Sequence, residues 1–113
     1  MYRWILLSLV LLTGCASTGM TAEQARNSAR IHTELASIYF ERAQMGVALG
    51  EIADALHANS NYAPAYNVRA LIHMALLEDK EAESDFQRSL SIDSENSDTQ
   101  SNYGWFLCQR GKE

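Results

Sequence analysis

Residues 34–56, ELASIYFERAQMGVALGEIADAL, align without a gap to residues 68–90, VRALIHMALLEDKEAESDFQRSL. The offset of 34 residues places side chains of matching size at the same positions: Ala36 with Ala70, Ala48 with Ala82, Ile52 with Phe86, and Ala55 with Ser89. Apolar residues recur every three or four positions in both stretches, which predicts helices. A fixed period of this length predicts a repeat protein whose units stack on one another.

The period and the residue types resemble the tetratricopeptide repeat, a helix-turn-helix unit. Small residues such as Ala36 let the two helices of a unit approach closely, and large residues such as Phe86 fill the space beside them. The resemblance implies an all-α solenoid of about two and a half repeats. Its parts are a first repeat at residues 29–62, a second at residues 63–96, and the first helix of a truncated third at residues 97–113. Arg69 and His73 depart from the pattern, because the repeat normally has Leu and Tyr there.

Local signals place the helix ends. Thr21 with Gln24 forms a predicted capping box, and Ser97 with Gln100 forms a second one ahead of the last helix. Pro64 is expected in the first turn of a helix, where its missing N–H costs nothing. The turns inside the two complete repeats are expected at Met45–Gly46 and at residues 77–79.

The N-terminus looks like a lipoprotein signal. Residues 1–14 carry Arg3 followed by an apolar run that is shorter than the roughly 20 residues of a membrane span, which predicts a signal peptide. The next residues resemble the lipobox of bacterial lipoproteins: Leu12, Thr13, Gly14 and Cys15. This resemblance implies cleavage before Cys15, acyl chains attached to it, and a tether and helix start at residues 15–28. The alternative is an ordinary signal peptide or buried apolar segment with a chance cysteine.

The resemblance also implies a location in the cell. Ala16 is not the aspartate of an inner-membrane retention signal, so the lipid anchor is expected on the periplasmic face of the outer membrane. The 113 residues include nine basic and 14 acidic side chains, a net charge of −5. Loss of Arg3 with the signal peptide makes the mature chain more acidic still. This charge disfavours nucleic acid and anionic head groups as partners.

The sequence favours a binding protein over an enzyme. His32, His57 and His73 lack metal-ligand spacing, and His32 and His73 are expected in the packed face between helices. The acidic run at residues 78–85 is interpreted as a solvated helix start, since it lacks the spacing of a calcium loop. No catalytic motif is found, and no metal or cofactor is expected apart from the lipid on Cys15. A catalytic domain beyond residue 113 is the remaining enzyme alternative.

Stacked helix pairs present a groove lined by the first helix of each unit. The repeat phase predicts its lining residues: Arg30, Thr33, Ser37 and Phe40 in the first repeat, Asn67, Leu71 and Met74 in the second, and Asp98, Ser101, Trp105 and Gln109 in the third. The lining is notably apolar, so we expect an amphipathic or apolar protein segment to bind there, with Trp105, Leu71 and Phe40 as anchors. The alternative is that sequence beyond residue 113 covers Trp105 and Leu71.

The lipobox, the two repeats and the stretch NYGWFLCQRG at residues 102–111 together resemble the type IV pilus biogenesis/stability lipoproteins, the PilF/PilW family. That family has about six repeats, so the resemblance makes this chain an N-terminal fragment. It implies a pilotin, which binds the outer-membrane secretin and promotes its localisation and multimer assembly. The alternative function is a general periplasmic repeat scaffold for cell-wall or outer-membrane assembly.

The last helix carries the second cysteine. Tyr103 and Gly104 are expected to be its close-packing pair, and Leu107 is expected in a large-residue position. Once Cys15 is acylated, Cys108 remains the sole thiol in an oxidising compartment, either as a small buried hydrophobic residue or as half of a disulfide. The favoured hypothesis is a disulfide to a cysteine beyond residue 113.

Overall fold

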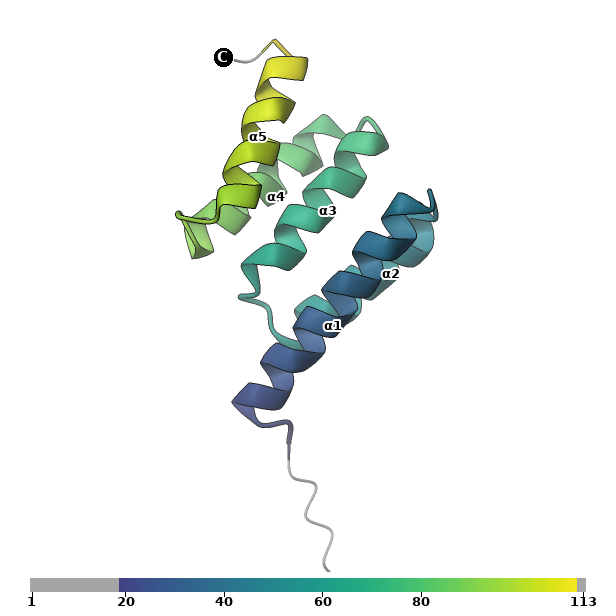
Figure 1. Cartoon of the computed structure of the whole chain (residues 1–113), viewed down its shortest axis with the longest axis vertical. Helices are drawn as coiled ribbons and strands as arrows, with labels where there is room; N and C mark the ends of the chain where they lie inside the picture. The colour runs from purple at the N-terminus through teal and green to yellow at the C-terminus, as the bar shows by residue number, and fades with distance from the viewer. Residues whose placement is uncertain (1–18, 112–113) are drawn as a thin grey trace, which may run out of the picture.

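The structure is a computed structural model that describes residues 19–111, and within this range it contains five helices and no strand. They are α1 (Ala22–Glu41), α2 (Met45–Ala58), α3 (Ala63–Ala75), α4 (Asp79–Ile92) and α5 (Ser97–Gln109). Figure 1 shows α1, α3 and α5 side by side on the near face, with α2 and α4 behind them. The lipobox residues Leu12, Thr13, Gly14 and Cys15 lie outside the described residues.

The helix pairing confirms the predicted all-α, tetratricopeptide-like fold. α1 packs against α2, and α3 packs against α4. The positions that match across the 34-residue period have no exposed surface in either pair: Ala36 and Ala70, Ala48 and Ala82, Ile52 and Phe86, Ala55 and Ser89. Small side chains thus bring the helices together while one large side chain fills each unit. None of the helices within residues 19–111 has the length and apolar character that crossing a membrane requires.

Two apolar clusters share α3. The first joins α1, α2 and α3 and contains Ile52, Val68 and Ile72. The second joins α3, α4 and α5 and contains Phe86 and Phe106, with Tyr103 and Leu107 packed against it. α3 is therefore covered from both sides, which fixes the relative position of the three helices that line the near face.

The turns repeat with the same period as the sequence. Ala43, Leu77 and Gly111 have positive φ values of 58°, 61° and 67°, and each lies 34 residues from the next. After α1, Gln44 N–H donates to Tyr39 O and Ala43 N–H donates to Phe40 O, which is the Schellman pattern that ends a helix. The prediction of a turn at Met45–Gly46 was therefore wrong, because the chain reverses at residues 42–44 and α2 begins at Met45.

Three other predictions concern helix starts. The Thr21–Gln24 capping box is confirmed, since each residue's backbone N–H donates to the other's side chain, at 2.9 and 3.1 Å. Pro64 lies in the first turn of α3, as predicted. The predicted Ser97–Gln100 box is wrong: Asn96 caps α5 by accepting from Thr99 N at 2.9 Å, and the Gln100 side chain instead donates to Ser94 O.

Candidate protein-binding groove

The near face of α1, α3 and α5 carries two adjoining hollows, which together we call the groove. All eleven residues predicted to line it lie at these hollows. Leu71, from the middle of α3, lines both hollows and divides the groove into a polar half and an apolar half. Because α3 contacts both α1 and α5, the two halves share one rigid floor.

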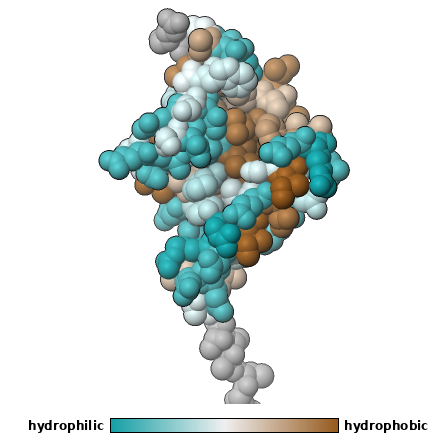
Figure 2. Space-filling view, viewed as in Figure 1, coloured by the Kyte–Doolittle hydropathy of each residue, from teal (hydrophilic) through white to brown (hydrophobic). Residues whose placement is uncertain are grey.

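The apolar half is a hollow of about 500 Å³ formed by the C-terminal ends of the three helices. It is lined by Phe40, Leu71, Met74, Ala75, Leu77, Trp105, Gln109 and Arg110. Trp105 is 56% exposed and Leu77 79% exposed, which is unusual for side chains of this size gathered in one place. Figure 2 shows this face with apolar surface in its centre and right-hand part, while hydrophilic surface covers its left side.

Arg110, the one cationic residue that lines the apolar half, already has an ion-pair partner. Arg110 Nε donates to both carboxylate oxygens of Asp79 at 2.8 Å, and the guanidinium also lies 5.6 Å from the centre of the Phe106 ring. Its charge is thus neutralised within the chain, and the hollow offers mainly apolar contact to a ligand.

The polar half is a hollow of about 370 Å³ formed by the N-terminal parts of the same helices. Arg30 forms an ion pair with Glu34 at 3.1 Å, so Asp98 is the lining residue whose charge has no ion-pair partner within residues 19–111. Burial raises the pKa of the Tyr62 phenol, and Glu34 acts in the same direction while Arg30 opposes it. This half therefore presents neutral hydrogen-bonding groups and one carboxylate.

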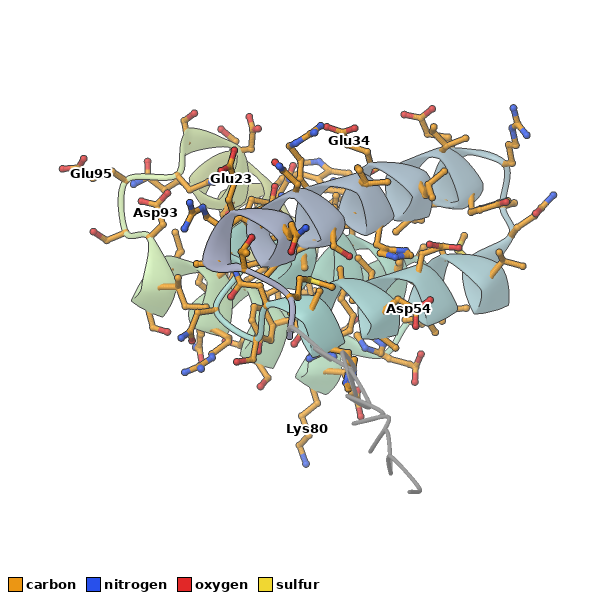
Figure 3. The ribbon with its side chains drawn as sticks, turned by 90° about the horizontal axis from the view of Figure 1, so that it is seen from below. Glu23, Glu34, Asp54, Lys80, Asp93 and Glu95 are labelled. Atoms are coloured by element: carbon orange, nitrogen blue, oxygen red, sulfur yellow. The ribbon has the colours of Figure 1, made fainter. Side chains whose placement is uncertain are left out.

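More acidic side chains surround this half. In Figure 3, Glu23 and Glu34 project from α1, and Glu95 projects from the turn before α5, all on the side where the groove lies. Both Glu23 and Glu95 are exposed. The rim of the polar half thus adds negative potential to that of Asp98.

Two asparagines face each other across the floor of the polar half. Asn102 Nδ2 donates to Asn67 Oδ1 at 3.3 Å, which links α5 to α3. This bond leaves the Asn67 amide group as a donor and Asn102 Oδ1 as an acceptor. The sequence pattern identified Asn67 but missed Asn102, which lies one position beyond the predicted lining residue Ser101.

A partly buried ion pair lies between α3 and α4, and sequence reasoning missed it. Arg69 Nε and Nη2 donate to the two oxygens of Asp85 at 2.7 and 2.8 Å, and the Asp85 side chain is only 8% exposed. The hydrogen bond to Asp85 raises the pKa of Arg69 further above its usual value. The interpretation of residues 78–85 as a solvated helix start was therefore wrong at Asp85. The replacement of the usual Leu by Arg69 was the signal that a buried acid had to lie opposite.

The two histidines expected between helices are half-buried and have carboxylate neighbours. His32 Nδ1 lies 2.7 Å from Glu51 Oε2, and His73 lies 3.4 Å from Glu78 and 3.7 Å from Asp85. His57 is exposed. His32, Glu51 and Asp54 bring ligand atoms within 4.8 Å of one another, the closest approach to a metal-binding group within residues 19–111. The bond between His32 and Glu51 links α1 to α2.

Cys108 is exposed and is not bonded to another cysteine within residues 19–111. Within residues 19–111, Cys108 is therefore not a buried hydrophobic residue, and both alternatives, burial by further sequence and a disulfide, stay hypotheses. Gly104 is also exposed, although Ala36 and Ala70 at the matching positions are fully buried. The reason is that α2 packs against the side of α1 that carries Ala36, and α4 packs against the side of α3 that carries Ala70. No helix within residues 19–111 packs against the side of α5 that carries Gly104.

Comparison with known proteins gives one distant relative. The chain is 28% identical over 111 aligned residues to the type IV pilus assembly protein PilF of Pseudomonas aeruginosa. The alignment covers 94% of this chain but 44% of PilF, so the chain spans less than half the length of that protein. No model of a known protein family matches the chain.

Proposed function

We propose that this chain belongs to a lipoprotein of type IV pilus biogenesis, and that its groove binds a protein partner. The observation that carries the proposal is the open apolar half of the groove, where Trp105 and Leu77 are more than half exposed. Exposed apolar surface that is gathered in a hollow marks a protein-binding site more often than a structural accident. The similarity to PilF supplies the biological setting.

The two halves of the groove suit different parts of one peptide. An apolar side chain seated against Trp105, Leu71 and Phe40 would remove both its own surface and theirs from water, at about 25 cal/mol per Å². The free donor of Asn67 and the free acceptor of Asn102 match the C=O and N–H of a peptide backbone. Asp98 and its acidic rim favour a Lys or Arg at that end of the peptide.

The partner we propose is the outer-membrane secretin of the type IV pilus, whose localisation and multimer assembly the protein would promote as a pilotin. In this scheme, acylated Cys15 holds the protein on the periplasmic face of the outer membrane. Several acyl chains on one residue would give stable anchoring, since each buried CH₂ contributes about 0.8 kcal/mol. The groove is then presented to secretin subunits as they arrive. This role needs no catalysis and no cofactor.

A deletion strain tests the proposal. Outer membranes from the deletion, run without boiling, are expected to show loss of secretin multimers and of surface pili. Return of the intact gene should restore both, while Trp105→Glu should not. Ala53→Glu is the matched control, because Ala53 is an exposed α2 residue that does not line the groove.

The anchor is tested separately. Cys15→Ala is expected to abolish incorporation of labelled palmitate and to release the protein from the outer membrane. Normal secretin multimers and normal pili in the deletion strain would reject the pilotin role, and a cell-wall or outer-membrane defect in their place would favour the general scaffold.

A further inference from the structure

Three side chains of the kinds that bind metal ions meet where α1 packs against α2. They are His32 of α1 and Glu51 and Asp54 of α2. Each offers a ligand atom within 4.8 Å of the other two, and His32 Nδ1 lies 2.7 Å from Glu51 Oε2. We call these three residues the histidine–carboxylate cluster. None of them lines the groove, and in Figure 3 Asp54 projects from α2, away from the groove residue Glu34 of α1.

The cluster carries two negative charges that no cationic side chain balances. Glu51 and Asp54 stand three residues apart on one helix, so their carboxylates repel each other. No Lys or Arg within residues 19–111 forms an ion pair with either of them. The Glu51 side chain is only 21% exposed, so solvent screens its charge less than that of a surface acid. A cation bound between the two carboxylates would relieve this repulsion.

The second repeat balances its charge at the same place from within the chain. At the 34-residue offset, the counterparts of the cluster are Tyr66, Asp85 and Arg88. Arg69 pairs with Asp85 at 2.7 Å. The guanidinium groups of Arg69 and Arg88 lie 5.3 and 5.7 Å from the centre of the Tyr66 ring. In the first repeat, an apolar residue and Asp54 stand in place of these two arginines, so its charge has to be balanced in another way.

We propose that the histidine–carboxylate cluster binds a divalent transition-metal ion, for which Zn²⁺ is the probe. A tetrahedral site with bonds of about 2.0–2.2 Å needs ligand atoms about 3.3 Å apart. The 2.7 Å contact and the 4.8 Å limit lie on either side of that spacing, so rotation of side chains is enough to form the site. His32 Nδ1 supplies a lone pair with the ring proton on Nε2, and water takes the fourth position. The imidazole selects against Mg²⁺ and Ca²⁺, which take oxygen ligands.

His73 also has two carboxylate neighbours, but their arrangement differs. Glu78 lies 3.4 Å from its Nδ1 and Asp85 lies 3.7 Å from its Nε2, so the two acids lie at opposite nitrogens of the ring. An ion bound to either nitrogen would reach only one of them, and Asp85 is already paired with Arg69. His73→Gln is therefore a matched control for His32→Gln.

Calorimetric titration with Zn²⁺ tests the proposal. The protein begins at residue 15, carries no histidine tag, is stripped of metal with EDTA, and has both cysteines changed to serine so that no thiol binds the ion. We expect one Zn²⁺ per chain, and a tenfold excess of Mg²⁺ or Ca²⁺ should not displace it. Because the ligands come from both helices of the first repeat, bound Zn²⁺ should also raise the Tm.

Variants of the protein locate the site. His32→Gln and Asp54→Asn should each weaken Zn²⁺ binding by about tenfold or more, while His73→Gln leaves it unchanged. Asp54 is exposed, so Asp54→Asn keeps the comparison valid if His32→Gln disturbs the packing of α1 on α2. Circular dichroism of each variant without metal checks that its helix content is retained.

Three results would overturn the proposal. The first is the lack of saturable Zn²⁺ binding, which would leave His32 and Glu51 as a hydrogen-bonded link between helices and no more. The second is equal affinity in the unchanged protein, His32→Gln and Asp54→Asn, which would show that the ion binds elsewhere on the acidic surface. The third is a loss of affinity in His73→Gln that matches the loss in His32→Gln, which would remove the distinction between the two histidines.

Discussion

The first and second repeats contain the same helix pair but differ in what surrounds them. Ile38 and Ile72 occupy the same repeat position, yet Ile38 is 44% exposed and Ile72 is fully buried. Inside the pairs, Leu35 is matched by Arg69, and Glu51 by Asp85. The comparison teaches that the period determines which residues meet inside a unit, whereas the neighbouring unit determines how much each outer position contributes to stability. The following predictions test that separation, starting with the largest effect.

The largest effect is expected at the large residue of α4. Phe86→Ala should lower the free energy of unfolding by about 3–5 kcal/mol, because it removes a buried ring. Phe86 also contacts α5, with ring centres 5.4 Å from Tyr103 and 5.7 Å from Phe106, so α5 should lose protection from hydrogen exchange. Ile52→Ala, at the same position in α2, should cost about 2–5 kcal/mol and leave the protection of α5 less affected. Hydrogen exchange is measured without urea. If the two variants lose the same protection in α5, the coupling between Phe86 and α5 is contradicted.

The next prediction compares the outer positions directly. Ile72→Ala should cost about 2–4 kcal/mol in urea unfolding, because a fully buried side chain leaves a cavity. Ile38→Ala should cost about 0.5 kcal/mol or less, because the side chain is already half in water. Similar costs for the two variants would mean that Ile38 is covered in solution, against the exposure that the structure gives it.

The polar interior of the second repeat gives a smaller effect. Arg69→Leu leaves Asp85 buried without its partner and should cost about 1–3 kcal/mol, less than for a fully buried pair because Arg69 is 33% exposed. The double variant Arg69→Leu with Asp85→Leu should recover most of that loss, since it also removes the buried carboxylate that Arg69→Leu leaves unpaired. A double variant that is less stable than Arg69→Leu alone would show that the pair contributes more than apolar packing can.

The turns give the smallest effect. Ala43 has a positive φ, which costs an L-residue about 1–2 kcal/mol. Glycine would remove this cost, but its greater flexibility in the unfolded chain would cost about 0.5–1 kcal/mol. Ala43→Gly should therefore stabilise the protein by about 0.5 kcal/mol. Gly111→Ala, at the matching position, should not stabilise it. Chemical denaturation of both variants distinguishes these outcomes, and destabilisation by Ala43→Gly would contradict the account of the turn.

The fold was predictable because its determinants are local and periodic. Ala36, Ala48 and Ile52 recur as Ala70, Ala82 and Phe86 at one spacing, which is enough to pair the helices and to place the groove residues on one face. The left-handed turn position was not predictable from the first two repeats, because Ala43 and Leu77 give no glycine signal, and hydrogen bonds at the helix end hold them there. Gly111 alone carries that signal.

The features missed from sequence depend on contacts between helices. Asp85 looked like one of several solvated acids, and only its position opposite Arg69 makes it part of the interior. Asn102 bonds to Asn67 across 35 residues, one more than the period, so repeat phase alone does not bring the two together. The exposure of Cys108 depends on whether a helix covers α5, which the residues of α5 do not encode.

The central claim is that the apolar half of the groove binds a protein partner. Trp105 reports on this directly, because the one other tryptophan in the sequence, Trp4, lies in the proposed signal peptide and is absent from a protein that begins at residue 15. Purified periplasmic regions of the type IV pilus secretin, titrated into this protein, should shift the Trp105 emission saturably to shorter wavelength as its 56% exposed ring leaves water. Calorimetric binding of the secretin regions with unchanged Trp105 emission would contradict the claim.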